Sequence, residues 1–184
     1  MARQYLQDGP YLDPPIASPL AADATTTILA MWNPLQFTKF YRDEARPCRA
    51  YCVKAGGIIT TATTGTLTIS PAITTTATGG TTLGVSGAQT VPGTALTAAA
   101  WWLDSVWVCR TIGAPGGNNA TMMGEGLFHT MGVVGTAGAG PLTVTFGGTS
   151  AVFDQSVANA INIQKTLSVA GSFTTHWALG FWMN

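Results

Sequence analysis

Short β-type segments separated by glycine- and proline-rich turns follow one another from residue 25 onward. Residues 65–71, GTLTISP, alternate cleanly, with Leu67 and Ile69 on one face and hydroxyl side chains on the other. Such spacing is typical of sandwiches, jelly rolls and barrels. The pattern predicts an all-β fold, a single β-sandwich or jelly-roll-like domain of about eight strands spanning residues 27–184.

Several local features refine this expectation. Residues 98–113 form the longest strand candidate, and Gly56–Gly57 indicates a bulge or bend in an earlier strand. Residues 170–172, AGS, fit a tight turn that pairs the last two strands with each other. The helix candidate is residues 154–161, with Asp154 as its N-cap.

Residues 1–26 differ from the rest because Pro10, Pro14, Pro15 and Pro19 punctuate them. Proline fixes φ and removes a hydrogen-bond donor, so the segment is expected to be an extended arm rather than a helix or inner strand. A disordered tail is the alternative. Regular apolar side chains favour an arm that becomes ordered on another subunit. These partner-contact candidates are Tyr5, Leu6, Tyr11, Leu12 and Ile16.

Charge is scarce, because only 9% of the 184 residues are charged and the formal net charge is zero. Ordinary soluble domains carry roughly 25% charged residues, so much of this surface is expected to be covered by other copies of the chain. The lack of a basic domain argues against nucleic acid as a partner. The sequence contains no run of about 18 apolar residues that could span a membrane, and no signal peptide is evident in it.

Tryptophans concentrate on two strand candidates. Alternation places Trp101, Leu103 and Trp107 on one face, with Trp102 and Asp104 on the other. One face is expected to pack inward, while the other meets solvent, a sugar or a neighbouring subunit. The candidates for the subunit interface or core are Trp101, Trp102, Trp107, Trp177 and Trp182.

Five of the eight basic residues lie between Lys39 and Lys54, together with Asp43 and Glu44. One interpretation is a solvated loop with local ion pairs, each worth roughly 0–1 kcal/mol. The other is a docking patch whose arginines make bidentate contacts with a partner's carboxylates. The partner-contact candidates in this segment are Lys39, Arg42, Arg46 and Arg49.

Groups capable of chemistry are few. Asp104 is expected to make a capping or interface hydrogen bond, and Glu125 to pair with an arginine. Cys48 and Cys52 fall on one face of a strand, and together with Cys109 are expected to be free thiols. The sequence therefore predicts no catalytic, metal or cofactor-binding residues, and hence no enzyme.

Short motifs are spread along most of the chain: WNPLQFT (32–38), RPCRAYCVKAGGIITT (46–61), GTLTISP (65–71), TTLGVSGAQTVPG (81–93), AAWWLDSVWVCRTIG (99–113), GEGLF (124–128), LTVTFGGTSAVFD (142–154) and TLSVAGS (166–172). Through these motifs the chain resembles small structural virion proteins of tailed bacteriophages.

The resemblance implies a minor capsid or head decoration (cement) protein, assembled into virions in the host bacterial cytoplasm. Such proteins are often trimers that clamp the major capsid protein. A tail-associated, receptor- or glycan-binding role is the alternative. No catalytic residues are implied.

Overall fold

A computed structural model of the chain describes residues 29–31, 38–61, 65–76, 79–91, 96–114, 119–131, 141–148 and 150–183. Within these ranges every regular element is a strand, as the all-β prediction requires. The strands are β1 (Leu29–Ala30), β2 (Lys39–Phe40), β3 (Ala50–Thr61), β4 (Thr66–Thr74), β5 (Thr81–Thr82), β6 (Gln89–Thr90), β7 (Ala99–Thr111), β8 (Ala120–Thr130), β9 (Leu142–Gly147), β10 (Ala151–Phe153), β11 (Asn159–Leu167) and β12 (Gly171–Met183). Strands β5 and β6 are only two residues long and lie between the long strands β4 and β7.

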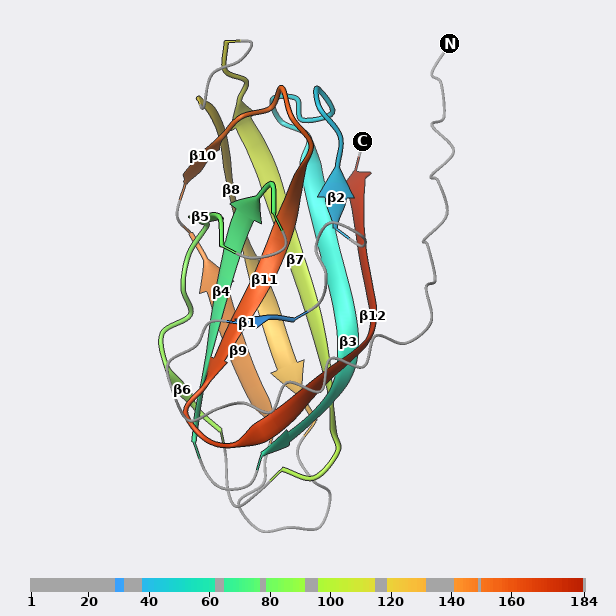
Figure 1. The fold of residues 1–184 in the computed structure, drawn as a ribbon, viewed down its shortest axis with the longest axis vertical. Coiled ribbons are helices and arrows are strands. Elements are labelled where there is room, and N and C mark those ends of the chain that lie inside the picture. The colour runs from blue at the N-terminus through green and yellow to red at the C-terminus, as the bar shows by residue number, and fades with distance from the viewer. Residues whose placement is uncertain are drawn as a thin grey trace.

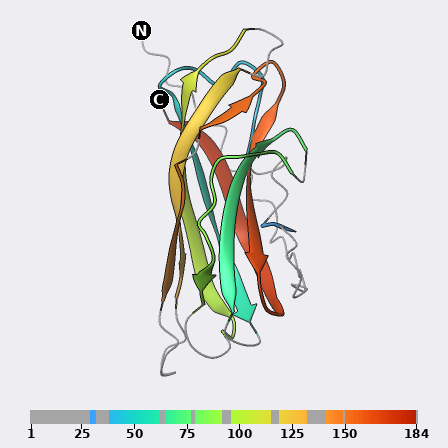
Figure 2. The same ribbon diagram turned by 90° about the vertical axis from the view of Figure 1, so that its left-hand side faces the viewer.

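The strands form two antiparallel sheets that pack face to face as a β-sandwich (Figures 1 and 2). Sheet A has the order β10-β8-β7-β3-β12, with β9 also paired to β8. Sheet B has the order β1-β11-β4-β5, with β2 paired to β11 and β6 to β4. The predicted fold class is confirmed, while the predicted arm, residues 1–26, lies outside the described residues.

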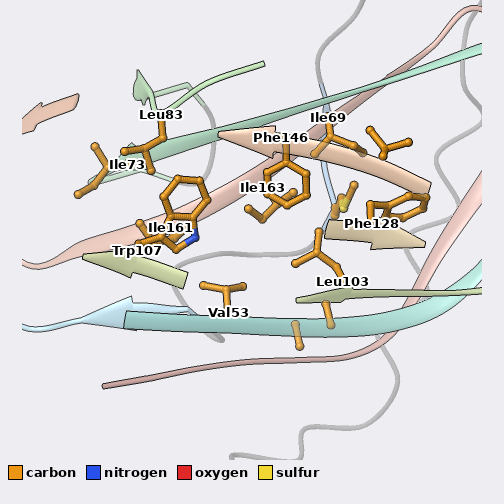
Figure 3. Packing of buried hydrophobic residues seen from close by; sticks show 14 of the residues in the cluster. Val53, Ile69, Ile73, Leu83, Leu103, Trp107, Phe128, Phe146, Ile161 and Ile163 are labelled. Atoms are coloured by element: carbon orange, nitrogen blue, oxygen red, sulfur yellow. The ribbon is translucent and has the colours of Figure 1, made fainter. Parts of the chain in front are cut away.

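The core fills the space between the inner faces of the two sheets. Along β7 the inward residues Trp101, Leu103 and Trp107 are buried, which confirms the predicted alternation. Ile161 and Ile163 of β11 meet them from sheet B (Figure 3). Burial of each such side chain stabilises the fold by roughly 1.5–3 kcal/mol.

The predicted pairing of the last two strands is wrong. β11 pairs with β4 in sheet B, whereas β12 pairs with β3 in sheet A through twelve residue pairs, from Gly171↔Thr61 to Met183↔Ala50. A short connection can join neighbouring strands of one sheet or strands of two facing sheets. The alternation within a single strand does not determine which other strand pairs with it. Residues 168–170 therefore cross between the sheets instead of closing a hairpin.

The predicted helix at residues 154–161 is also wrong, because this segment is a turn followed by the start of β11. Asp154 Oδ1 accepts hydrogen bonds from Ser156 N at 2.8 Å and from Ser156 Oγ at 2.6 Å. Asn159 Nδ2 donates to the carbonyl of Asp154 at 2.7 Å. These short-range bonds satisfy the backbone locally and so compete with a helix.

The irregularity expected at Gly56–Gly57 lies in the neighbouring strand. β3 continues through both glycines, and the bulge is in β12 between Thr175 and Trp177. A Cβ atom on Gly57 would overlap the carbonyl oxygen of Thr174. Glycine is therefore required here because the β12 backbone approaches closely at its bulge.

The open side between the sheets is closed next to β12 by β1 and β2. Both pair antiparallel with β11, through Leu29↔Lys165 and Lys39↔Ala160. Thr175 Oγ1 of β12 donates to the carbonyl of Met31 at 2.6 Å. The described chain thus begins at the border between the sheets, beside β12.

Candidate functional site

The register of sheet A aligns one row of side chains across five strands on its outer face. The row, called the tryptophan row below, is Trp177 of β12, Gly56 of β3, Trp102 of β7, His129 of β8 and Thr143 of β9. Trp177 is 42% exposed and Trp102 is 39% exposed. Two large aromatic side chains therefore face outward on either side of a glycine.

Contacts within the row fix the orientation of its rings. A Cβ atom on Gly56 would lie 2.7 Å from Trp177 Nε1, so the indole of Trp177 rests over the backbone of Gly56. The rings of Trp102 and His129 have their centroids 5.5 Å apart at an interplanar angle of 35°. His129 Nδ1 and Thr143 Oγ1 are hydrogen-bonded at 2.9 Å. The row is an aromatic surface with polar groups at one end.

The next row carries an ion pair. Lys54 Nζ donates to Asp104 Oδ2 at 2.7 Å, and this hydrogen bond raises the pKa of Lys54. The two residues are directly opposed in β3 and β7, so Asp104 makes a cross-strand pair rather than the expected capping or interface bond. Both side chains are about two-fifths exposed, which limits the pair to roughly 0–1 kcal/mol.

Glu125 lies on the outer face of β8, opposite Val106. The two ion pairs of the described residues do not include it, so the expected arginine partner is not found among them. Asp104 and Glu125 occupy diagonal positions on neighbouring strands and line one open hollow of about 750 Å³. Asp154 lies apart from both, in the turn that follows β10.

Beyond Glu125 the outer face becomes apolar at the end of the sandwich where the C-terminus lies (Figure 1). Phe181 is in one row with Val106, and Met183 is in the next row with Val108 and Met123. Val108, Met123 and Met183 are each more than a third exposed. These five residues are called the end patch.

A shallow hollow of about 420 Å³ opens on the end patch, lined by Val106, Val108 and Met123 together with Arg110 and Glu125. Arg110 is exposed, and its Nη1 lies 4.0 Å from the sulfur of Met123. The patch thus has an apolar floor with a cation and an anion beside it.

The basic segment folds into a defined loop at the same end. Glu44 Oε2 accepts hydrogen bonds from Tyr41 N at 2.7 Å and from Trp182 Nε1 at 3.3 Å. Arg49 donates to the carbonyl of Glu44 at 3.1 Å and stacks over Trp182 with its Cζ 4.9 Å from the ring centroid. Arg49 and Glu44 therefore hold the loop against the last strand.

The other basic candidates point outward. Arg42 pairs with Asp43 at 3.2 Å, and both side chains are well exposed. Arg46 is exposed, and Lys39 lies 5.4 Å from the ring centroid of the exposed Tyr41. Local ion pairing and outward-facing arginines thus coexist in this loop.

The five candidate tryptophans occupy different environments. Trp101 and Trp107 are core residues, and Trp101 packs on Phe173 with ring centroids 4.7 Å apart. Trp102 and Trp177 share the outer row. Trp182 is half-buried and packs edge-on against a core tyrosine and phenylalanine. The arm candidates lie outside the described residues; they are Tyr5, Leu6, Tyr11, Leu12 and Ile16.

The three cysteines are free, as predicted. Cys48, however, precedes β3 and adopts a positive φ of 65° in a turn, so it does not share a strand face with Cys52. Burial raises the pKa of the Cys52 and Cys109 thiols. In the described part of the chain, no group of three histidine, cysteine or acidic side chains could hold a metal ion.

Most of the end patch could not be identified from the sequence. Alternation along β7 puts Val106 and Val108 on the same face as Trp102 and Asp104. Met123 and Met183 join them only through the pairing of β8 and β12, which the sequence does not specify.

Comparison with protein families, curated proteins and solved structures finds no match for this chain. No helix of the described residues is long and apolar enough to cross a membrane.

Proposed function

We propose that this chain is a non-enzymatic structural component of a bacteriophage virion, a capsid decoration (cement) protein that binds the outer surface of the head and stabilises it. The observation that carries the proposal is the end patch, an exposed apolar area on a chain with only 9% charged residues. Exposed apolar patches on folded domains mark interaction sites. The virion context comes from the sequence resemblance.

Self-association is the first role of this surface. Hydration of Val108, Met123 and Met183 is unfavourable, and a second copy of the chain would remove these side chains from water. Flanking charges of both signs, on Arg110 and Glu125, can pair across a subunit contact. A homotrimer is the assembly that the resemblance implies, and closed cyclic symmetry would bury the patch in every subunit.

Binding to the major capsid protein is assigned to the basic loop. Arg42 and Arg46 extend from a loop that Glu44 and Arg49 hold in place, so their guanidinium groups are presented with little loss of backbone freedom. Guanidinium groups bind carboxylates through two parallel hydrogen bonds. Acidic side chains on the outer surface of the head are the expected partners.

Light scattering of the purified full-length protein tests self-association, and a trimer is expected. Met123→Asp should shift the protein toward monomers, because a carboxylate would be buried in the contact. Met131→Asp is the matched control, since Met131 is 55% exposed and follows the opposite end of β8. A monomeric wild type, or equal effects of the two substitutions, would refute this role.

Co-sedimentation with heads that lack this protein tests the decoration role. The wild type should pellet with the heads, and the Arg42→Glu, Arg46→Glu double variant should not. The Arg42→Lys, Arg46→Lys double variant keeps the charges but loses the planar guanidinium groups, so it should bind the heads weakly. Absence of wild-type binding would exclude head decoration.

The tryptophan row favours a second candidate function, a tail-associated or receptor-binding protein that recognises glycans. Sugar rings stack on exposed indoles when polar groups lie nearby, and here Lys54, Asp104 and His129 border Trp102. A glycan array would show specific binding that Trp102→Ala abolishes. Without such binding to the wild type, this candidate is rejected.

A further inference from the structure

The end patch lacks a cover among the described residues, and the chain itself contains a segment suited to it. Residues 1–28 precede β1, and β1 lies at the border between the sheets beside β12. β12 contributes Phe181 and Met183 to the end patch. The segment therefore joins the described chain next to β12, the strand that carries part of the uncovered surface.

The segment is longer than the distance from β1 to the end patch. Residues 1–28 span up to ~90 Å when extended, and the part between Ile16 and Leu29 alone spans up to ~40 Å. From Thr175, which contacts Met31, to Met183 the path along β12 is only ~26 Å. The segment is thus long enough for its apolar residues to contact an end patch.

The segment and the rest of the chain carry net charges of opposite sign. Residues 1–28 contain Arg3 and three aspartates, Asp8, Asp13 and Asp23, for a net charge of −2. Because the whole chain is neutral, the remaining residues carry a net charge of +2. At the end of the sandwich that bears the patch, Arg46 is exposed, Arg42 is exposed and paired with Asp43, and Arg110 is exposed beside Glu125. The charges of the two parts are complementary.

The segment, like the patch, carries apolar side chains next to charged ones. Leu6, Tyr11, Leu12 and Ile16 flank Asp8 and Asp13, so apolar groups and carboxylates alternate along it. The patch offers apolar side chains from β7, β8 and β12, with Arg110 and Glu125 at its border. The prolines prevent the segment from adding as a regular inner strand, which favours contact across the sheet face.

We propose that residues 1–28 of one copy dock on the end patch of a second copy, so that exchanged arms link the subunits. The proposal rests on the self-association assigned above and names the segment that makes the contact. Leucine, isoleucine and tyrosine side chains of the arm cover Val108, Met123 and Met183, while its aspartates lie near Arg110. Each subunit both gives an arm and receives one.

Disulfide trapping between differently tagged full-length chains tests this assignment. All chains carry Cys48→Ser, which removes the exposed native thiol, while Cys52 and Cys109 are buried. One chain carries Leu12→Cys and the other carries Met123→Cys. After unfolding, mixing and refolding, mild oxidation should join the two tags in one covalent dimer. A partner chain with Met131→Cys is the control and should give at least tenfold less dimer.

A single chain with both Leu12→Cys and Met123→Cys distinguishes exchange from folding back. Exchange gives covalent oligomers, whereas an intrachain disulfide without oligomers would overturn the proposal. Light scattering on the same samples separates the two hypotheses. A monomeric protein refutes the proposed self-association. An oligomer that forms no Leu12→Cys to Met123→Cys bond refutes only the arm contact.

Discussion

Replacement of Lys165 by methionine should stabilise the fold at neutral pH, because this lysine lies in the core between the sheets. It alternates with Ile163 and Leu167 on the inner face of β11 and is only 1% exposed. Its Nζ atom lies 5.2 Å from the ring centroid of Phe173. Neither ion pair of the described residues includes it. Methionine has a similar length and no charge.

The expected magnitude follows from the pKa. Burial lowers the pKa of Lys165 from 10.5 to about 8, and each pKa unit corresponds to about 1.4 kcal/mol. The charged amine therefore costs the native state about 3 kcal/mol at pH 7. Its attraction to the face of Phe173 offsets roughly 0.5–2 kcal/mol and is lost in the variant. Lys165→Met should raise the free energy of unfolding by roughly 1–3 kcal/mol.

The pH dependence has a defined sign. Below pH 8 the amine is charged in both the native and unfolded states, so the full cost applies. Between about pH 8 and 10.5 the native state loses the proton first, and the stability of the wild type rises relative to the variant. Tyr51, Cys52 and Cys109 have raised pKa values and act in the opposite direction, but both proteins share them. The difference between the proteins thus isolates Lys165.

Urea unfolding at pH 7, 8, 9 and 10, at one protein concentration, measures this difference. A fixed concentration is needed because self-association adds to apparent stability. Lys54→Met is the control, since Lys54 lies on the surface in an ion pair and its loss should cost at most about 1 kcal/mol. Equal stability of Lys165→Met and wild type at every pH would refute the reasoning, because the amine would then be well solvated or paired in the native state.

Four further substitutions test local features of the fold by urea unfolding. Cys48→Gly should add roughly 0.5–1 kcal/mol, because a φ of 65° suits glycine; a loss of stability would contradict this. Gly57→Ala should destabilise or misfold the protein, since the new methyl group would meet the Thr174 carbonyl, and normal stability would contradict the close approach. Trp107→Ala should cost about 3–5 kcal/mol, whereas Trp102→Ala, on the surface, should cost under about 1 kcal/mol; similar costs would contradict the assigned faces.

Features that depend on one strand were predictable from the sequence. Alternation along β7 placed Trp101 and Trp107 inward and Trp102 outward, because side chains of a strand point to opposite faces. The same rule places Lys165 on the apolar face of β11 with Ile161 and Ile163. Burial of a strand residue is thus encoded locally.

Features that depend on pairing between strands were not predictable. The turn at residues 168–170 could not tell a hairpin from a crossing between the sheets. Trp102 and Trp177 are far apart in the chain and become neighbours only because both strands pair with β3 at Gly56. The candidate surface is therefore a property of register, which a single sequence specifies only through the packing of the whole core.

Gly56 links the fold to the outer surface. Glycine within a strand is unfavourable by roughly 0.5–1 kcal/mol relative to alanine, yet any Cβ at this position would push against the ring of Trp177. A tryptophan that merely filled surface space could turn away from an alanine at no great cost. The indole instead lies over the glycine, so Trp177 and Trp102 flank the same backbone position on the outer face. Glycine at this position thus lowers the local stability of the strand and at the same time lets the Trp177 ring rest against the β3 backbone.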